Sequence, residues 1–249
     1  MRRKRNPIRS DLAWSTPERI TVRGRDLPGR ILGRLNLGDM AFLELTGREP
    51  NARESRLFNA MVVTLVEHGV TPSALAARLT YLGAPEAMQA AVAAGLCGLG
   101  SVFVGSTEGC AKLLSEALKK KDSKINLKEL ARKIVRETKL IPGLGHPLHK
   151  PVDPRSVRLF QIARDTGYYG RYCRLMVEIS KTKKLLVNAT GAIAALACEL
   201  GFDWRICRGL GVMARAIGLV GHLLEEARRP MAQEVWLRVE KEASRHLKK

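Results

Sequence analysis

The residues best suited to chemistry lie in one short stretch, Ile141–Pro147. Gly143 and Gly145 flank a leucine directly before His146. Glycine lets a backbone approach a ligand closely and leaves N–H groups accessible, and the two prolines of this stretch restrict its shape. An imidazole, whose pKa is near neutrality, suits proton transfer at such a place. The stretch is therefore predicted to be a loop that faces a ligand.

Arginines follow at positions that favour an anionic ligand. Asp153-Pro154-Arg155 opens a predicted helix with an arginine in its first turn, where a guanidinium offers two parallel hydrogen bonds to a carboxylate. Arg215 lies in an otherwise apolar helical stretch, and Arg229 precedes a proline. Because an arginine among apolar residues needs an anionic partner, Arg215 either binds a ligand or pairs with an Asp or Glu of this chain. Both interpretations stay open.

Other polar residues have structural explanations. His149 follows His146 by three positions, as in an H-x-x-H metal pair, but no third ligand is near in sequence, so no metal site is predicted. His222 is interpreted as a structural helix histidine and not as a catalyst. Glu67, beside His68, is interpreted as an ion-pair partner and not as a base.

Helices must position these residues, because long strand alternation is absent and only Ile20–Val22 favours an extended segment. Cap residues and prolines mark several helix starts, among them Thr71, Asn126 and Asp153. The fold class is therefore predicted to be mainly α. The helical patterns cover residues 28–35, 38–46, 53–69, 71–82, 86–99, 107–120, 127–137, 154–164, 168–182, 186–200, 203–217 and 218–227.

Composition narrows the function classes. The chain has 249 residues, of which 45% are hydrophobic, enough for a globular core. Its formal net charge of +19 admits nucleic acid, an acidic membrane or a multiply charged small molecule as partner. Aromatic residues make up only 5% and are not interleaved with the basic runs, so nucleic-acid binding is not expected.

Two further features bear on the setting of the protein. Residues 87–107 carry no charge but are rich in Ala and Gly, which predicts a buried helix, at the core or at a dimer interface, and no membrane span. The five cysteines form no C-x-x-C pair and indicate neither disulfides nor zinc, so a reducing cytoplasm is expected. The basic start, Arg2–Arg5, is followed by no apolar stretch, so a secretory signal is not expected.

Taken in order, the motifs resemble those of the citrate synthase superfamily, and more those of its citryl-CoA lyase branch than those of full-length synthases. The resemblance implies an all-α homodimer that binds coenzyme A, as acyl-CoA, and a carboxylic acid, with no metal. It implies a large domain of residues 1–104 and 202–249 and a small domain of residues 105–201. The motifs are Glu67-His68-Gly69, Ala94-Gly95-Leu96, Gly105–Glu108, Pro142–Pro147, Asp153-Pro154-Arg155, Asn188–Ala192, Ala214-Arg215-Ala216 and Gly221-His222.

The resemblance also assigns roles. Pro142, Gly143, Leu144 and Gly145 would lie along coenzyme A. His146 would act as acid or base at the substrate hydroxyl. The residues that would hold the hydroxy-polycarboxylate are His68, His146, Arg155 and Arg215, with Arg229 reaching across the dimer.

Two positions depart from the family pattern. The family histidine that hydrogen-bonds the enolate oxygen falls on Phe103, and the family aspartate that exchanges a proton with the acetyl methyl falls on Thr190. Thr190 is interpreted either as the residue that occupies this catalytic position or simply as a helix cap. Glu67 and Glu108 are weak candidates for a replacement base.

The expected function is that of a citryl-CoA lyase-like enzyme, which makes or cleaves a carbon–carbon bond between an acyl-CoA enolate and a keto acid. Three alternatives stay open. The first is a lyase repurposed for a different acyl-CoA thioester, and the second is a catalytically impaired relative that binds CoA. The third is a non-catalytic regulatory protein whose basic surface binds nucleic acid.

Overall fold

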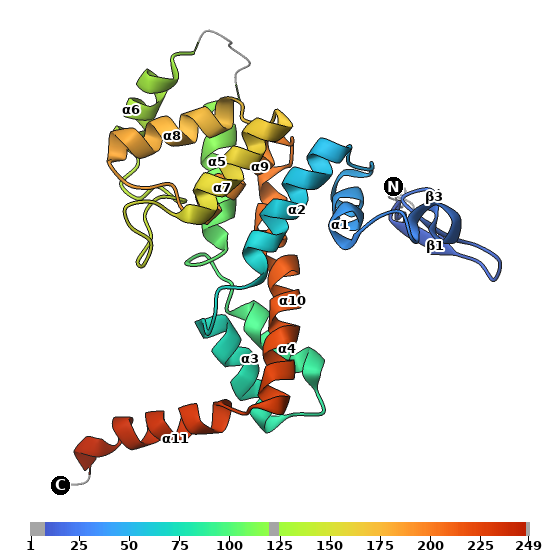
Figure 1. The fold of residues 1–249 in the computed structure, drawn as a ribbon, viewed down its shortest axis with the longest axis vertical. Coiled ribbons are helices and arrows are strands. Elements are labelled where there is room, and N and C mark those ends of the chain that lie inside the picture. Colours follow the sequence, from blue (N-terminus) through green and yellow to red (C-terminus); the bar gives the residue numbers. More distant parts are fainter. Residues whose placement is uncertain (1–7, 120–124, 248–249) are drawn as a thin grey trace, which may run out of the picture. The chain divides into compact units, whose positions relative to one another are not determined.

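The computed structural model describes residues 8–119 and 125–247, and these are mainly helical, as expected (Figure 1). Two compact units divide the chain, Met1–Asn59 and Ala60–Lys249. The boundary falls within one helix, α2 (Ala52–Val66).

Some expectations lie beyond what this structure tests. The division into a large domain, with residues 1–104 and 202–249, and a small domain of residues 105–201 stays a prediction. The basic run Arg2–Arg5 lies outside the described residues, and of the basic run Lys119–Lys124 only Lys119 is described.

The first unit begins with a small antiparallel sheet in the order β1-β2-β3. The sequence predicted only its middle strand, whose three residues are all β-branched, whereas the strands beside it contain none. The helix predicted over residues 28–35 is wrong: a π-helix ends at Ile31, because Leu32 is extended and Gly33 has φ +73°. The elements are β1 (Ala13–Ser15), β2 (Ile20–Val22), β3 (Arg25–Asp26), the π-helix Leu27–Ile31 and α1 (Leu37–Thr46), around a core of Val22, Ile31 and Leu43.

The second unit holds the remaining helices. Thr71, Asn126 and Asp153 accept backbone N–H groups at three of the helix starts, which confirms the predicted caps. The elements are α3 (Pro72–Gly83), α4 (Met88–Cys97), α5 (Gly105–Ala117), α6 (Leu127–Glu137), α7 (Pro154–Thr166), α8 (Arg171–Lys183), α9 (Ala189–Glu199), a 3₁₀ turn (Trp204–Ile206), α10 (Cys207–Arg228), α11 (Ala232–Ala243) and a second 3₁₀ turn (Arg245–Leu247).

Helix α9 packs against α5, α7 and α8 (Figure 1). Nine of its eleven residues are buried, and most of these are small, which lets neighbouring helices approach closely. Asn188 caps α9 through its side chain. The first turn of α9 is therefore held rigidly inside the unit.

The uncharged segment 87–107 is not one helix buried in the core, so that alternative of the prediction is wrong. Its helix, α4, buries only Ala91 and Gly95, and the chain turns before α5 begins. The predicted close helix contact is confirmed at Gly95, where a Cβ would lie 2.7 Å from Leu219 Cδ1 and 2.9 Å from the Ser73 carbonyl oxygen. A role in a dimer interface stays a prediction.

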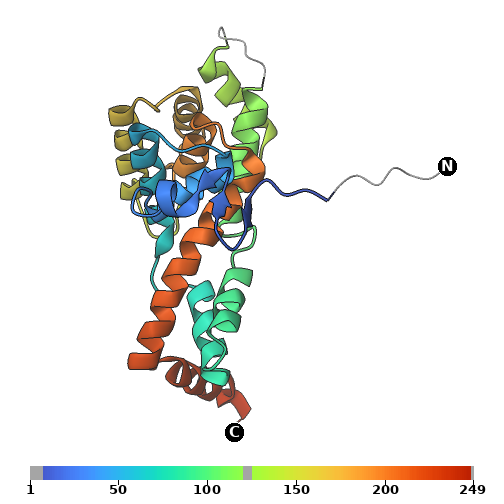
Figure 2. The ribbon, with the colours of Figure 1, turned by 90° about the vertical axis from the view of Figure 1, so that its right-hand side faces the viewer.

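Helix α10 is a single helix and not two, because Gly218 lies inside it without breaking it. It runs alongside α3 and α4 (Figure 2). Among the described residues, Trp204–Arg228 is the one segment long and apolar enough to cross a membrane. Half of its apolar 18-residue stretch is buried within the unit. Arg215, His222 and Glu226 are buried on α10, a pattern typical of a core helix with polar partners. Helix α11 was not predicted.

Candidate functional site

The glycine loop, defined as Pro142–Gly145, is held against the segment that leads into α9. The Gly145 N–H donates to the Leu186 carbonyl over 2.8 Å, and the Asn188 N–H donates to the Gly143 carbonyl over 3.0 Å. The Asn188 side-chain amide donates to the Gly145 carbonyl over 2.8 Å. These bonds fix the loop without any help from a ligand.

Two glycines bring the loop against α9. A Cβ on Gly143 would lie 2.5 Å from Gly191 Cα, and a Cβ on Gly191 would lie 2.3 Å from the Gly143 carbonyl oxygen. Gly143 also has φ +85°, which disfavours any side chain. A Cβ on Gly145, in contrast, would meet nothing within 4 Å. The loop is therefore close-packed at Gly143 and open at Gly145.

The Asp-Pro-Arg motif starts α7 and directs its arginine at His146. Asp153 Oδ1 accepts the Arg155 backbone N–H and Nε, each over 3.0 Å, and Oδ2 accepts Arg155 Nη2 over 2.8 Å. Oδ2 also accepts the Ala189 N–H over 2.9 Å. Burial opposes ionisation of Asp153, but these bonds hold its pKa below the usual range. One buried carboxylate thus joins the starts of two helices to the site arginine.

The hydrogen bonds of His146 select its tautomer. Nδ1 accepts the N–H groups of Leu148 and His149, over 3.1 and 3.0 Å, so the neutral ring carries its hydrogen on Nε2. Burial, and next the neighbouring His149 and Arg155, lower the pKa of His146 and favour the neutral ring. Arg155 Nη2 lies 3.3 Å from Nε2, so two donors face each other. An anionic oxygen to one side of the pair, within hydrogen-bond distance of both nitrogen atoms, would satisfy both.

Three histidines gather at this point. The rings of His68 and His146 stack with centroids 5.8 Å apart, those of His146 and His149 with centroids 4.3 Å apart. One nitrogen atom from each of the three rings lies within 4.8 Å of the other two. His68 therefore supplies a third possible metal ligand, which the sequence near His146 and His149 lacks. A cation here would compete with the Arg155 guanidinium and with the donors at His146 Nδ1. These surroundings favour an anion, and the expectation of no metal stays a prediction.

Ser106 contacts both unusual positions, Phe103 through its backbone and Thr190 through its side chain. The Ser106 hydroxyl lies 2.8 Å from the Phe103 carbonyl oxygen and 2.9 Å from Thr190 Oγ1. The Thr190 hydroxyl donates to Asn188 Oδ1 over 2.7 Å. Both partners of Thr190 are neutral, so neither acts as a base. The interpretation of Thr190 as a cap is wrong, because the capping residue is Asn188.

The two glutamates weighed as replacement bases are both engaged. Glu108 pairs with Arg208 over 2.6 Å. Glu67 Oε1 accepts the backbone N–H groups of His68 and Gly69 and faces Nε2 of His222. Each carboxylate therefore has structural partners. These contacts agree with the interpretation of Glu67 as an ion-pair partner and not as a base.

The other predicted arginines lie on or after α10. Arg215 is buried, and its Nε has no hydrogen-bond partner among the described residues. Burial lowers the pKa of Arg215, and the nearby Glu67 opposes this. Arg229 is exposed at the end of α10, about 20 Å along the helix axis from Arg215 at 1.5 Å per residue. Its role across a dimer stays a prediction.

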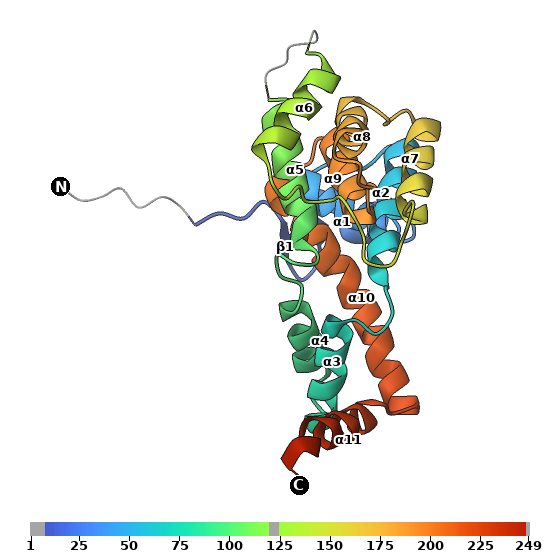
Figure 3. The ribbon, with the colours of Figure 1, turned by 90° about the vertical axis from the view of Figure 1, so that its left-hand side faces the viewer.

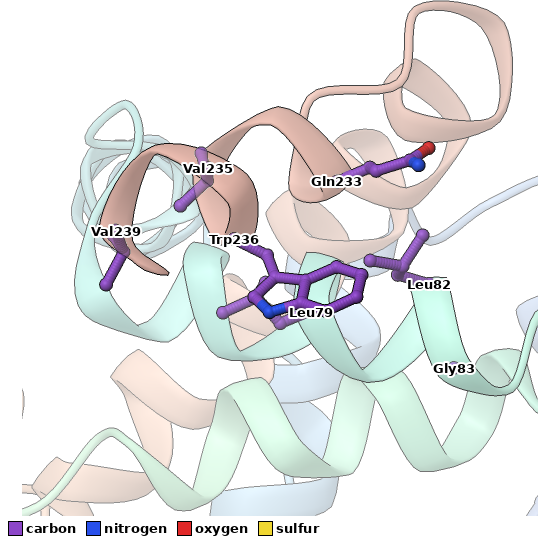
Figure 4. A pocket seen from close by; sticks show the side chains of 7 residues that line it. All are labelled: Leu79, Leu82, Gly83, Gln233, Val235, Trp236 and Val239. Carbon is purple, nitrogen blue, oxygen red and sulfur yellow. The ribbon is translucent and has the colours of Figure 1, made fainter. Parts of the chain in front are cut away.

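An apolar groove lies apart from these residues. Its volume is about 690 Å³, between α3 and α11, where the Trp236 side chain lies over α3 (Figure 4). None of the predicted site residues lines it. The lining residues are Leu79, Leu82, Gly83, Gln233, Val235, Trp236 and Val239.

Sequence reasoning found the glycine loop, His146 and Arg155 but missed their supports. Ser106 and Asn188 carry ordinary polar side chains whose importance depends on contacts distant in sequence. Asp153 was found only as a helix cap, although the D-P-R spacing is the signal that its carboxylate can also reach the arginine.

A helical fold that holds a glycine loop, a neutral histidine and arginines in one unit defines a protein suited to an acidic ligand. The family model "Citrate synthase, C-terminal domain" matches residues 34–236. The chain belongs to the citrate synthase family, which confirms the resemblance.

Solved structures support this assignment. Citryl-CoA lyase from Hydrogenobacter thermophilus is 35% identical with a TM-score of 0.80, over 89% of this chain and 87% of that one. ATP citrate lyase from Methanothrix soehngenii, in complex with citrate and coenzyme A, is 20% identical with a TM-score of 0.72, over 91% of this chain and 40% of that one. The second likeness shows the fold alone.

Curated relatives are longer. Citrate synthase 2 of Bacillus subtilis is 25% identical over 189 residues, which are 73% of this chain and 50% of that protein. A probable ATP-citrate synthase of Dictyostelium discoideum is 22% identical over 91% of this chain and 39% of that protein. The chain thus spans half or less of these two relatives.

Proposed function

We propose that this protein breaks a carbon–carbon bond in a citryl-CoA-like thioester and releases an acyl-CoA and a keto acid. The observation that carries the proposal is the pair of donors, His146 Nε2 and Arg155 Nη2, that face each other 3.3 Å apart beside the glycine loop. The likeness to a citryl-CoA lyase along most of both chains supports it.

The proposed roles follow the geometry. The open side of the glycine loop at Gly145 would receive coenzyme A. Arg155 would bind a carboxylate of the acid, since Asp153 holds its guanidinium in place. His68 and Arg215 would complete the acid site. A homodimer, with Arg229 of a second copy, belongs to the same proposal.

His146 would act at the hydroxyl oxygen of the substrate. In cleavage the hydroxyl proton passes to solvent, the hydroxyl-bearing carbon becomes a ketone, and the electrons of the broken bond form the thioester enolate. The enolate then takes a proton at its α-carbon, so no co-reactant is needed. The Nε2–H tautomer favours hydrogen-bond donation to the oxygen, whereas a role as base requires the other tautomer.

Thr190 bears on proton transfer at the α-carbon of the acyl-CoA. Condensation needs a base that removes a proton from an acyl-CoA methyl group, and Thr190 has only neutral hydrogen-bond partners. Cleavage forms a strongly basic enolate, which solvent can protonate. Since a positioned acid or base typically contributes about 10²- to 10⁴-fold, we expect proton transfer at the α-carbon to be slow in both directions.

The test is release of acetyl-CoA and oxaloacetate from citryl-CoA by the purified protein. We expect release by the wild type and a loss of roughly 100-fold or more in His146→Ala. Arg205→Gln is a matched surface control, because Arg205 lies in a similar Asp-x-Arg sequence but is exposed. Binding of CoA without product would refute the proposal and favour an impaired relative.

The same proposal is tested by deuterium exchange into the methyl group of acetyl-CoA. Exchange should be slow in the wild type and faster in Thr190→Asp, because the added carboxylate supplies the missing base. Rapid exchange in the wild type would show that another group already removes the methyl proton.

A further inference from the structure

A chain of polar contacts lies behind His68. Arg78 of α3 is only 1% exposed, and its Nε and Nη2 lie 3.3 and 2.9 Å from His222 Nδ1 on α10. Its Nη1 donates to Glu226 Oε2 over 2.8 Å, and Nη2 also contacts Glu225. Arg78 therefore has carboxylate partners on one side and an imidazole on the other.

The arginine determines which tautomer His222 adopts. A guanidinium can only donate, so His222 Nδ1 accepts and the ring hydrogen is on Nε2. Nε2 lies 3.1 Å from Glu67 Oε1 and donates to it. The same Glu67 oxygen accepts the N–H groups of His68 over 2.7 Å and Gly69 over 2.8 Å. Hydrogen bonds thus connect a buried arginine to the backbone of an exposed site histidine.

The surface of α10 is shaped for this contact. The connection from α2 to α3 passes beside α10 (Figure 3), and Gly218 allows it to approach. A Cβ on Gly218 would lie 2.1 Å from the Val66 carbonyl oxygen. Arg215, Gly218 and His222 share one face of the helix by their spacing. The Glu67 carboxylate therefore faces Arg215 as well as His222.

We infer that Arg78, His222 and Glu67 form a positioning relay that sets the backbone of His68 and places a counter-charge beside Arg215. All three are positioning residues and do not touch the substrate. The relay contacts His68 and Arg215, the two residues proposed to bind the acid, and makes none of the glycine-loop contacts. It therefore controls affinity for the carboxylic acid and leaves CoA affinity unchanged. The inference rests on the proposed function only for the identity of that acid.

Two substitutions at one position separate positioning from general stability. In His222→Gln the side-chain amide nitrogen is as many bonds from Cβ as Nε2, so it still donates to Glu67. In His222→Asn the amide reaches only the position of Nδ1, so the contact with Glu67 is lost. Glu226→Gln is the matched control, because it weakens another buried partner of Arg78 that has no contact with the segment at His68.

The first readout is citrate and CoA binding by titration calorimetry. Loss of a hydrogen bond to a charged group predicts a roughly tenfold weaker citrate affinity in His222→Asn, with CoA affinity unchanged. His222→Gln should stay close to the wild type, and Glu226→Gln should lose stability but keep its citrate affinity. Equal citrate affinities in the Asn and Gln variants, or an equal loss in Glu226→Gln, would overturn the relay.

The second readout needs no ligand. Amide hydrogen exchange at His68 and Gly69 should rise roughly tenfold in His222→Asn and stay near wild type in His222→Gln. Long-range nitrogen–proton NMR spectra should show the Nε2–H form of His222. If the wild type releases no product from citryl-CoA, the proposed function fails, while these spectra still test the relay. Unchanged exchange in His222→Asn, or an Nδ1–H ring, would overturn it.

Discussion

Replacing Asp153 by asparagine would test the connection between the starts of α7 and α9. Asp153 is fully buried and accepts four hydrogen bonds, two at each carboxylate oxygen. Asparagine presents one oxygen and one NH₂ group. In either orientation the NH₂ faces two donors, which belong either to Arg155 alone or to Arg155 and Ala189.

The size of the effect follows from these contacts. Breaking a buried ion pair typically costs about 3–5 kcal/mol, but Arg155 is 26% exposed and water relieves part of the loss. We expect a loss of about 2–4 kcal/mol in the free energy of unfolding. For a chain of this size that corresponds to a decrease in Tm of roughly 5–15 °C.

The pH dependence gives an independent check. A carboxyl group whose pKa is depressed by folding stabilises the fold above its unfolded pKa and loses that contribution as pH falls through the folded pKa. Asp153 has such a depressed pKa, so the wild type should lose stability toward acid and Asp153→Asn should lose less of it. Thermal unfolding monitored by circular dichroism between about pH 7 and pH 3 measures both effects.

The control is Asp203→Asn. Asp203 also accepts the N–H and the guanidinium of the arginine two residues later, but this pair is exposed. Its substitution should change Tm much less than Asp153→Asn does. Equal decreases in the two variants, or an acid transition in Asp153→Asn that matches the wild type, would refute the argument that burial makes Asp153 important.

Three smaller perturbations test other parts of the site. Gly191→Ala places a methyl group 2.3 Å from a glycine-loop carbonyl and should cost about 1–3 kcal/mol by denaturant unfolding, whereas Gly209→Ala meets nothing within 4 Å and should not destabilise. Because burial and His149 lower the pKa of His146, the acid limb of kcat/KM should lie below about pH 6.5 and move upward in His149→Gln; an unmoved limb would contradict this. Cys97 is exposed and the other four thiols are buried, so a disulfide reagent should titrate one thiol in the native protein and five after unfolding; a second fast thiol would contradict the burial.

The sequence predicted most helices because their caps and periodicity are local. It failed where the outcome depends on distant partners. Two helices, 203–217 and 218–227, were predicted in place of α10, whereas Gly218 at their boundary serves the close approach of the Val66 carbonyl. Helix α11 was missed because a proline ends α10, although Glu226 caps the next helix by accepting the N–H groups of Met231 and Ala232.

The site shows the same division between local and distant causes. The glycine loop and the D-P-R motif were recognisable because each lies within a few residues. The supports of these motifs were not, since Asn188 reaches Gly145 and Ser106 reaches Thr190 only in the fold. His222 was recognised as structural, but its partners Arg78 and Glu67 are far away in the sequence.

The basic character of the chain and the affinity of the site have different physical origins. Arg155 is paired with Asp153 and Arg215 faces Glu67, so the two site arginines add little uncompensated charge. The value of Arg155 to a ligand lies in being held in place by Asp153, because an arginine that is already ordered loses less conformational entropy on binding. The remaining excess of the +19 charge acts over longer distances, where it attracts a phosphorylated ligand and is screened by salt. Under the proposed function, the pairing of Arg155 provides geometry for the acid, while the net surface charge favours the approach of coenzyme A.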